Sequence, residues 1–237
     1  MRLDLYLTEK QLCKSRTAAQ ALIKSGGVQL NGKVCQKPSQ EAADADNVEI
    51  IGEQLRYVGR GGLKLEGAIA SFRLELSGAE CIDIGSSTGG FTDCMLQHGA
   101  AKVYAVDVGR DQLVQSLRDD PRVVSMEQTD IRTAELPQVD FIGTDVSFIS
   151  LRLIIPHIFR LMKSGGTAVA LIKPQFEAGK QNLSKNGIVR DERVRLKICR
   201  DIAGFAEECG FKVIGTAPSP ITGGDGNVEY LLCLKKR

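Results

Sequence analysis

Residues 81–92 read CIDIGSSTGGFT, an apolar run followed by a glycine-rich turn. The run is typical of a buried β-strand, and the turn is typical of a loop that leads from a strand into a helix. In an open parallel sheet, ligands bind beyond the carboxyl end of such a strand, where glycines let the backbone come close. The helix that follows favours an anionic or carboxylate group at its N-terminus. This stretch therefore predicts a ligand site in an α/β fold.

On both sides of this stretch, strand-like segments alternate with helix-like ones. The strand-like segments are residues 81–85, 102–108, 123–127, 141–147, 167–173, 211–216 and 229–234. The helix-like segments are residues 62–72, 90–98, 112–117, 150–162 and 191–209. Such alternation predicts a doubly wound parallel sheet. The last two strands are joined by a Pro/Gly-rich loop without a helix, so we expect them to pair antiparallel. The predicted fold class is α/β, with the Rossmann-like seven-stranded sheet of methyltransferases and an antiparallel last strand.

The glycine-rich turn also indicates which cofactor binds. Position 87 is Ser, so the middle glycine of a dinucleotide fingerprint is absent. Asp83 points instead to S-adenosylmethionine, because a carboxylate there can hold the cofactor's ammonium group. Asp107 ends the next strand and can accept both ribose hydroxyls, while Asp130 can accept from the adenine amino group. In the competing interpretation, the glycines only turn the chain and the aspartates cap helices. Three carboxylates at successive strand ends favour the cofactor site over this alternative. The predicted cofactor residues are Asp83, Gly85, Ser87, Gly89, Phe91, Asp107 and Asp130.

The first part of the chain has a different composition. Residues 1–40 carry seven basic and two acidic side chains, a net +5, whereas the whole chain of 237 residues carries +2. Residues 3–7 fit a short helix, Ser15 is a predicted N-cap for a second one, and Asn31-Gly32 suits the type I′ turn of a hairpin. With a returning strand at 48–51, these elements predict a small α+β domain over residues 1–51.

The order Arg16, Ala18-Ala19, Leu22, Ile23, Gly27, Val28 and Asn31-Gly32 resembles the alpha-L RNA-binding motif. The resemblance implies an RNA-binding domain that contacts phosphates and shape rather than base edges. A solvated basic face is the competing interpretation. A second basic region, residues 173–197 with a net +4, contains the long polar loop 174–189, which is interpreted as a lid over the RNA, with a surface insertion as the alternative. The predicted RNA contacts are Lys14, Arg16, Lys24, Lys33, Arg60, Lys180 and Lys185.

Four further charged residues are expected to meet at the carboxyl edge of the sheet. Lys64 begins the helix before the first strand, Asp145 and Lys173 end the fourth and fifth strands, and Glu229 lies on the last. A methyl donor brings its own leaving group, so the protein must orient and deprotonate a nucleophile. Taken singly, each residue also fits a solvated or structural role.

Together, Lys64, Asp145, Lys173 and Glu229 resemble the Lys-Asp-Lys-Glu tetrad of FtsJ-type RNA 2′-O-methyltransferases. The flanking segments resemble the TlyA family over essentially the whole chain; they are residues 60–65, 83–92, 145–150, 173–177 and 226–230. This resemblance implies methylation of a ribosomal RNA cytidine at its ribose 2′-hydroxyl with S-adenosylmethionine. It implies that Lys173 is the proton acceptor, that Lys64 and Glu229 position the ribose, and that Asp145 organises Lys173 and the methyl end of the cofactor.

The resemblance also implies a domain organisation and a class of partner. It implies an RNA-binding domain at 1–51, a linker at 52–60 and an S-adenosylmethionine-dependent methyltransferase domain at 61–237. The expected partners are ribosomal RNA or ribosomal subunits. Two features depart from the FtsJ pattern: Val-Ser-Phe follows Asp145, and Phe91 stands in place of a tryptophan. Tyr57 and Tyr230 are candidates for stacking on a flipped base, with packing as the alternative.

Composition excludes several other classes. The seven cysteines are odd in number and never spaced Cys-x-x-Cys, so we expect no disulfide framework, no zinc or other metal site, and a reducing, cytoplasmic location. The most apolar segment, residues 151–162, is interrupted by charged residues and proline, so no membrane span is expected. Three alternatives stay open: a membrane-active hemolysin, a methyltransferase with a non-RNA substrate, and an RNA-binding scaffold. The sequence leaves the oligomeric state open.

Overall fold

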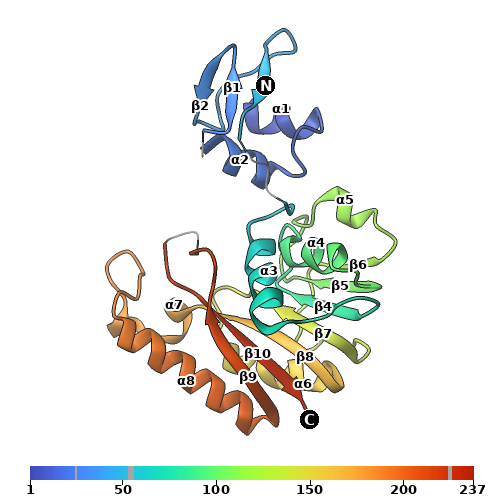
Figure 1. Ribbon diagram of the computed structural model, residues 1–237, viewed down its shortest axis with the longest axis vertical. Coiled ribbons are helices and arrows are strands. Elements are labelled where there is room, and N and C mark those ends of the chain that lie inside the picture. The colour runs from blue at the N-terminus through green and yellow to red at the C-terminus, as the bar shows by residue number, and fades with distance from the viewer. Residues whose placement is uncertain (25, 53–55, 224–225) are drawn as a thin grey trace.

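The protein consists of a small N-terminal domain and a larger C-terminal domain joined by a short connection (Figure 1). The computed structural model describes residues 1–24, 26–52, 56–223 and 226–237. Within these residues, no helix is both long enough and apolar enough to cross a bilayer.

The N-terminal domain packs two helices against a three-stranded antiparallel sheet with the order β2-β1-β3. Its elements are α1 (Leu3–Glu9), α2 (Arg16–Lys24), β1 (Val28–Leu30), β2 (Lys33–Cys35) and β3 (Val48–Ile50). The predicted cap is confirmed, because the Ser15 hydroxyl accepts the amide N–H of Ala18 at 3.1 Å. Asn31 and Gly32 both have positive φ, as a type I′ turn requires.

The C-terminal domain is built on a seven-stranded sheet with the order β6-β5-β4-β7-β8-β10-β9. Its strands are β4 (Glu80–Ile84), β5 (Lys102–Val106), β6 (Val123–Met126), β7 (Val139–Thr144), β8 (Met162–Ile172), β9 (Phe211–Pro218) and β10 (Tyr230–Lys236). Strands β6, β5, β4, β7 and β8 are parallel neighbours, and β10 runs antiparallel to both β8 and β9. The predicted fold class is therefore confirmed.

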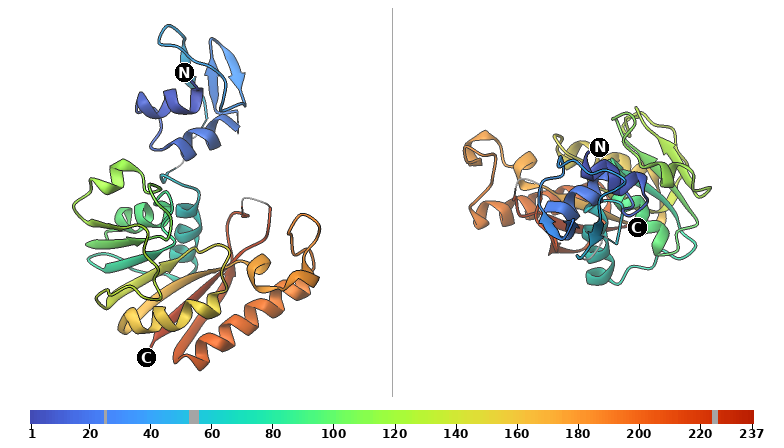
Figure 2. Two further views of the ribbon diagram at one scale, coloured as in Figure 1. Left: turned by 180° about the vertical axis from the view of Figure 1, so that it is seen from behind. Right: turned by 90° about the horizontal axis from the view of Figure 1, so that it is seen from above.

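Helices cover both faces of this sheet. They are α3 (Gly61–Phe72), α4 (Gly90–Gln97), α5 (Gln115–Arg118), η1 (Leu151–Leu153), α6 (Ile155–Leu161), α7 (Pro174–Glu177), η2 (Lys180–Asn182) and α8 (Glu192–Glu208). Alternate strand residues bury against opposite layers: Cys81 packs with α3 and α4, and Ile82 with α6 and α8. The first layer lies in front of the sheet in Figure 1, and Figure 2 brings α6 (yellow) to the front.

Several predicted boundaries were wrong, among them that of the strand expected at 167–173, which begins five residues earlier as β8. The helix expected at 112–117 is a single turn at Gln115–Arg118, because the amides of Gln112 and Leu113 bond to the Glu127 carboxylate instead. The helix expected at 150–162 is divided into η1 and α6, and Pro156 lies in the first turn of α6, a position that a proline tolerates. Glu229 lies just before β10 rather than on it.

Among the described residues, hydrogen bonds tie the N-terminal domain to residues 56–58, just before the C-terminal domain. The Ser15 hydroxyl, besides capping α2, donates to the carbonyl of Val58, and Lys14 Nζ donates to the carbonyl of Arg56 at 2.7 Å. The Val58 amide donates in turn to the carboxylate of Asp93 at 2.8 Å, in the first turn of α4. The connection therefore contacts the helix that follows the glycine-rich turn.

Candidate active site

The four predicted tetrad residues come together at the carboxyl edge of the sheet. Asp145 and Lys173 directly follow the parallel neighbours β7 and β8. Glu229 precedes β10, whose first residue Tyr230 pairs with Ile172. Lys64 reaches the same place from the first turn of α3. The strand connections alone therefore place three of the four side chains side by side.

Their charged groups form a continuous chain. Lys173 Nζ lies 2.6 Å from Asp145 Oδ1, and Lys64 Nζ lies 3.5 Å from Asp145 Oδ2 and 2.7 Å from Glu229 Oε2. Lys173 Nζ also donates to the Ser147 hydroxyl at 2.8 Å. The four side chains are between 2% and 17% exposed, so their ion pairs are little screened by solvent. Two ammonium groups alternate with two carboxylates, and each lysine is fixed by at least one carboxylate.

A cavity of about 500 Å³ adjoins this cluster, within the usual size range of a cofactor site. Gly85, Ser87, Asp107, Asp130 and Asp145 are among its lining residues. The remaining predicted cofactor residues, Asp83, Gly89 and Phe91, are outside the described lining. The cavity thus lies between the glycine-rich turn and the tetrad.

The backbone of the turn explains why glycine stands at position 85. Gly85 has φ +83°, and a Cβ there would lie 2.8 Å from the carbonyl oxygen of Asp145. Ser87 also adopts a left-handed conformation, with φ 46°. Its amide donates to Asp107 Oδ2 at 2.8 Å, while the Gly109 amide donates to Asp107 Oδ1 at 2.7 Å. Asp107 therefore holds the turn and the loop after β5 on either side of the cavity.

Asp83 carries a carboxylate that is only half satisfied. Its side chain is fully buried, and Oδ2 accepts the amide and hydroxyl of Thr92 at 2.9 and 2.7 Å. Oδ1 has no hydrogen-bond partner among the described residues. Burial raises the pKa of this carboxyl to about 7, and the nearby Asp145 and Asp107 add to the rise. An unpartnered acidic oxygen at this position fits the ammonium group of S-adenosylmethionine, as the sequence predicts.

Two predicted cofactor residues are engaged elsewhere in the structure. The Asp130 carboxylate pairs with Arg132 at 2.6 Å, and this hydrogen-bonded guanidinium lowers its pKa to about 2. Phe91 is buried in the core between the sheet and α3, and a Cβ on Gly143 would lie 2.9 Å from its ring. Asp130 lines the cavity but is already paired, and Phe91 supports the turn from beneath.

Sequence reasoning missed two residues beside the cavity. Glu127 follows β6, and its carboxylate accepts the amides of Asp111, Gln112 and Leu113 at 2.8–2.9 Å. Arg118 donates to the same carboxylate at 3.0 Å. Glu127 therefore holds the loop after β5, and its place at a strand end is the signal that could have identified it.

The second missed residue is an aromatic one. Phe148 is 91% exposed, has φ 64°, lines the cavity, and lies 5.0 Å from the Phe176 ring between centroids. The aromatic candidates from the sequence, Tyr57 and Tyr230, are 0% and 8% exposed. These two tyrosines pack, and the aromatic surface beside the tetrad belongs to Phe148.

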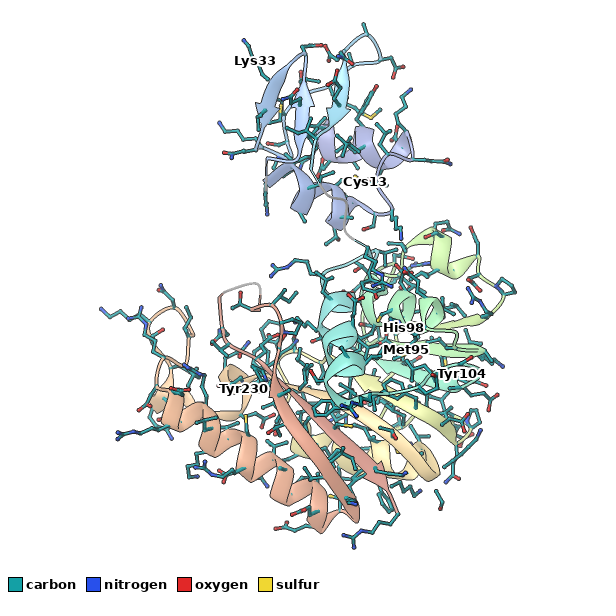
Figure 3. All side chains as sticks on the ribbon, viewed as in Figure 1. Cys13, Lys33, Met95, His98, Tyr104 and Tyr230 are labelled. Atoms are coloured by element: carbon teal, nitrogen blue, oxygen red, sulfur yellow. The ribbon has the colours of Figure 1, made fainter. Side chains whose placement is uncertain are left out.

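The predicted RNA contacts are spread over both domains. Lys14, Arg16, Lys24, Lys33, Arg60 and Lys185 are exposed, and the side chain of Lys180 lies outside the described residues. Arg16 pairs at 3.0 Å with Asp4, a buried carboxylate that Arg2 also holds. Arg60 donates to the carbonyl of Thr222 at 3.0 Å, in the loop that leads to Glu229. Figure 3 shows Lys33 at the end of the N-terminal domain that is remote from the C-terminal domain.

A seven-stranded sheet of this order, with a cofactor cavity and an ionic tetrad at its carboxyl edge, defines a Rossmann-like methyltransferase. The family model described as FtsJ-like methyltransferase matches residues 57–236, and the S4 domain model matches residues 1–48. The molecule is thus an S-adenosylmethionine-dependent methyltransferase that carries an S4 RNA-binding domain.

Full-length relatives define the family further. The chain is 40% identical over 239 residues to the 16S/23S rRNA (cytidine-2′-O)-methyltransferase TlyA of Mycobacterium tuberculosis, covering 99% of this chain and 89% of that protein. It is 44% identical over 238 residues to Hemolysin A of Brachyspira hyodysenteriae, covering 98% of each. A solved structure from Streptococcus thermophilus, provisionally described as a hemolysin, shares 46% identity with a TM-score of 0.80, covering 100% of this chain and 88% of that one. The chain belongs to the TlyA family.

Proposed function

We propose that this protein methylates the ribose 2′-hydroxyl of a cytidine in ribosomal RNA. The observation that carries the proposal is the chain of ion pairs from Lys173 through Asp145 and Lys64 to Glu229, beside a cavity of cofactor size. The activity named for the TlyA relative supports the choice of ribosomal RNA and cytidine. In this proposal residues 1–51 bind the RNA, residues 52–60 link the two domains, and residues 61–237 transfer the methyl group.

The tetrad residues then divide the chemistry among them. S-adenosylmethionine supplies a methyl group activated by a positively charged sulfur. Lys173 first gives up one proton to solvent, and its neutral Nζ would then accept the proton of the 2′-hydroxyl. The ribose oxygen bonds to the methyl carbon as the carbon–sulfur bond breaks, which leaves a neutral thioether. Asp145, at 2.6 Å, stabilises the ammonium group that results, and Ser147 fixes its direction. Lys64 and Glu229 hold the ribose hydroxyls by donating to and accepting from them, with both side chains preorganised by their own 2.7 Å ion pair.

Asp83, Asp107 and the glycine-rich turn bind the cofactor in this proposal. The unpartnered oxygen of Asp83 accepts from its ammonium group, and Asp107 accepts from its ribose. Gly85, Ser87 and Gly89 shape the turn through their left-handed backbones. Phe91 acts from the core, and Asp130 meets the adenine end only after exchanging its contact with Arg132.

We expect Phe148→Ala to weaken recognition of the target nucleotide. Stacking of a base on an aromatic side chain contributes about 1–3 kcal/mol, so the KM for RNA should rise about 5- to 100-fold. Phe148→Tyr keeps the ring and should stay close to the wild-type value. Steady-state methylation with varied RNA measures this, and equilibrium titration measures the Kd for S-adenosylmethionine. An unchanged KM for RNA, or a loss confined to cofactor affinity, would contradict the role in base stacking.

The decisive experiment identifies the methylated atom. Purified protein is incubated with labelled S-adenosylmethionine and with ribosomal subunits or naked ribosomal RNA, and the RNA is then digested to nucleosides. We expect the label in 2′-O-methylcytidine. A methylated base, or label in protein, would overturn the proposal. Lysis of erythrocytes by detergent-free protein that has no RNA-directed activity would favour the function for which Hemolysin A is named.

A further inference from the structure

The N-terminal half of α8 presents a basic stripe to solvent. The stripe consists of Arg193, Leu196, Lys197 and Arg200, spaced i, i+3, i+4 and i+7, and all four are exposed. Residues at this spacing share one face of a helix. The opposite face of α8 is buried against the sheet through Ile198, Cys199, Ile202 and Ala206. The stripe is therefore the outward face of a firmly packed helix.

Local helix stability does not explain these charges. A helix dipole favours acidic residues in the first turn and basic residues in the last. Asp191 caps α8 and Glu192 lies in its first turn, but the first half also contains Arg193, Arg195, Lys197 and Arg200, and the last turn has Glu207 and Glu208 and no basic residue. Lys197 pairs with Asp201 at 2.8 Å, but Arg193 and Arg200 form no ion pair within the described part of the chain. Over residues 191–200 four basic side chains outnumber two acidic ones, and none of the four lies in the last turn, where the dipole favours positive charge.

Hydrogen bonds connect the start of α8 and the loop before it to the segment that carries Glu229. Asn227, which is 2% exposed, accepts the amide of Val189 and donates to the carbonyl of Gly187, both at 3.2 Å. Arg195 donates to the Tyr230 hydroxyl at 3.3 Å and to the carbonyl of Arg190 at 2.7 Å. Figure 3 shows Tyr230 where β10 meets the upper part of α8. The start of α8 is thus held at a fixed position relative to the tetrad.

We propose that Arg193, Lys197 and Arg200 form a second phosphate-binding surface for the RNA substrate, separate from the S4 domain. The inference rests on the proposed function and adds the path that the RNA strand takes over the methyltransferase domain. Figure 1 shows the N-terminal domain beyond the start of α3, and the N-terminal end of α8 beyond the start of β10. An RNA strand that contacts both the N-terminal domain and α8 is held on two sides of the tetrad. The target ribose is then fixed between these two contacts. Arginine suits this task because its guanidinium can bind phosphate through two hydrogen bonds.

The test compares two triple variants that remove the same net charge. The first is Arg193→Ala/Lys197→Ala/Arg200→Ala. The control is Lys212→Ala/Lys235→Ala/Arg237→Ala, three exposed residues at the start of β9 and the end of β10, the opposite edge of the sheet. RNA binding is measured with a naked ribosomal RNA fragment and with intact subunits, across a range of salt concentrations. Cofactor affinity and kcat at saturating RNA are measured alongside.

For the stripe variant we expect RNA affinity to fall about 10- to 100-fold and the slope of log K against log salt to shrink by about 2–3, since each phosphate contact contributes about 0.7–0.9. Cofactor affinity and kcat should stay unchanged, and the control should bind as the wild type does. A stripe variant that matches the control overturns the inference. So does a loss seen only with intact subunits, which would assign the surface to a ribosomal protein. Failure of the wild type to methylate RNA would overturn the proposed function instead, while the binding slopes, which need no turnover, still decide on the stripe.

Discussion

Lys173→Ala is expected to reduce methyl transfer to RNA about 10²- to 10⁴-fold, the range for loss of a general base. The alanine leaves no group at the end of β8 to accept the hydroxyl proton, and it leaves Asp145 with Lys64 as its remaining cation, at 3.5 Å. The cofactor cavity does not include Lys173 in its described lining, so S-adenosylmethionine should still bind. Single-turnover methylation separates the chemical step from RNA binding and measures the loss directly.

Lys212→Ala provides the matched control, because it removes an exposed lysine at the other edge of the sheet. Circular dichroism checks that both variants fold, and titration with S-adenosylmethionine checks the cavity. If Lys173→Ala transfers methyl groups at a near-normal rate, the residue is not the proton acceptor. If it loses cofactor binding as well as turnover, Lys173 also supports the cavity through Asp145, which belongs to both the tetrad and the cavity lining.

The tetrad could be predicted because it depends on topology rather than on loop conformation. Asp145 and Lys173 each stand directly after an apolar strand, and neighbouring parallel strands end at one edge whatever the intervening chain does. Glu229 requires one more step, the antiparallel pairing of the last strand, which the short loop without a helix indicates. Strand ends therefore identify candidate site residues from sequence more reliably than helix boundaries do.

Loop contacts escaped prediction for a physical reason. Phe148 combines exposure with a left-handed backbone. The strand end could have identified Glu127 itself, but not the three amides it meets, because the loop bends at Asp111, which is also left-handed. Non-glycine residues rarely adopt this conformation, so no pattern of residue types announces it. The ion pair between Asp130 and Arg132, two residues further on, also could not be predicted, because the strand-end position of Asp130 indicates a ligand contact equally well. Each of these features depends on a local bend rather than on the order of the strands.

Asp83→Asn is expected to weaken S-adenosylmethionine binding about 10- to 100-fold, because a hydrogen bond between charged groups contributes about 1.5–3 kcal/mol. The same change should stabilise the cofactor-free protein. The pKa of Asp83 is about 7 in the folded state, whereas the ordinary pKa of an aspartate is 3.8. The folded wild type therefore binds more protons than the unfolded chain between these two values, and its stability falls as the pH rises through that window. Asparagine has no charge to bury and escapes this loss.

The stability gain of Asp83→Asn should accordingly be small near pH 4, grow up to about pH 7 and stay level above it, with each pKa difference of one equal to about 1.4 kcal/mol. Urea unfolding at several pH values measures the gain, and calorimetry of cofactor binding should show wild-type affinity falling below pH 7. Asp140→Asn gives a control of opposite sign, because the Glu80 amide and Lys163 lower the pKa of Asp140, so its loss should destabilise the protein at neutral pH. Unchanged cofactor affinity together with no gain at pH 8 would show that the buried carboxylate serves the fold rather than the cofactor. Weaker cofactor binding together with a stability gain at pH 8 would mean that the buried carboxylate lowers the stability of the cofactor-free protein in order to bind a cationic ligand.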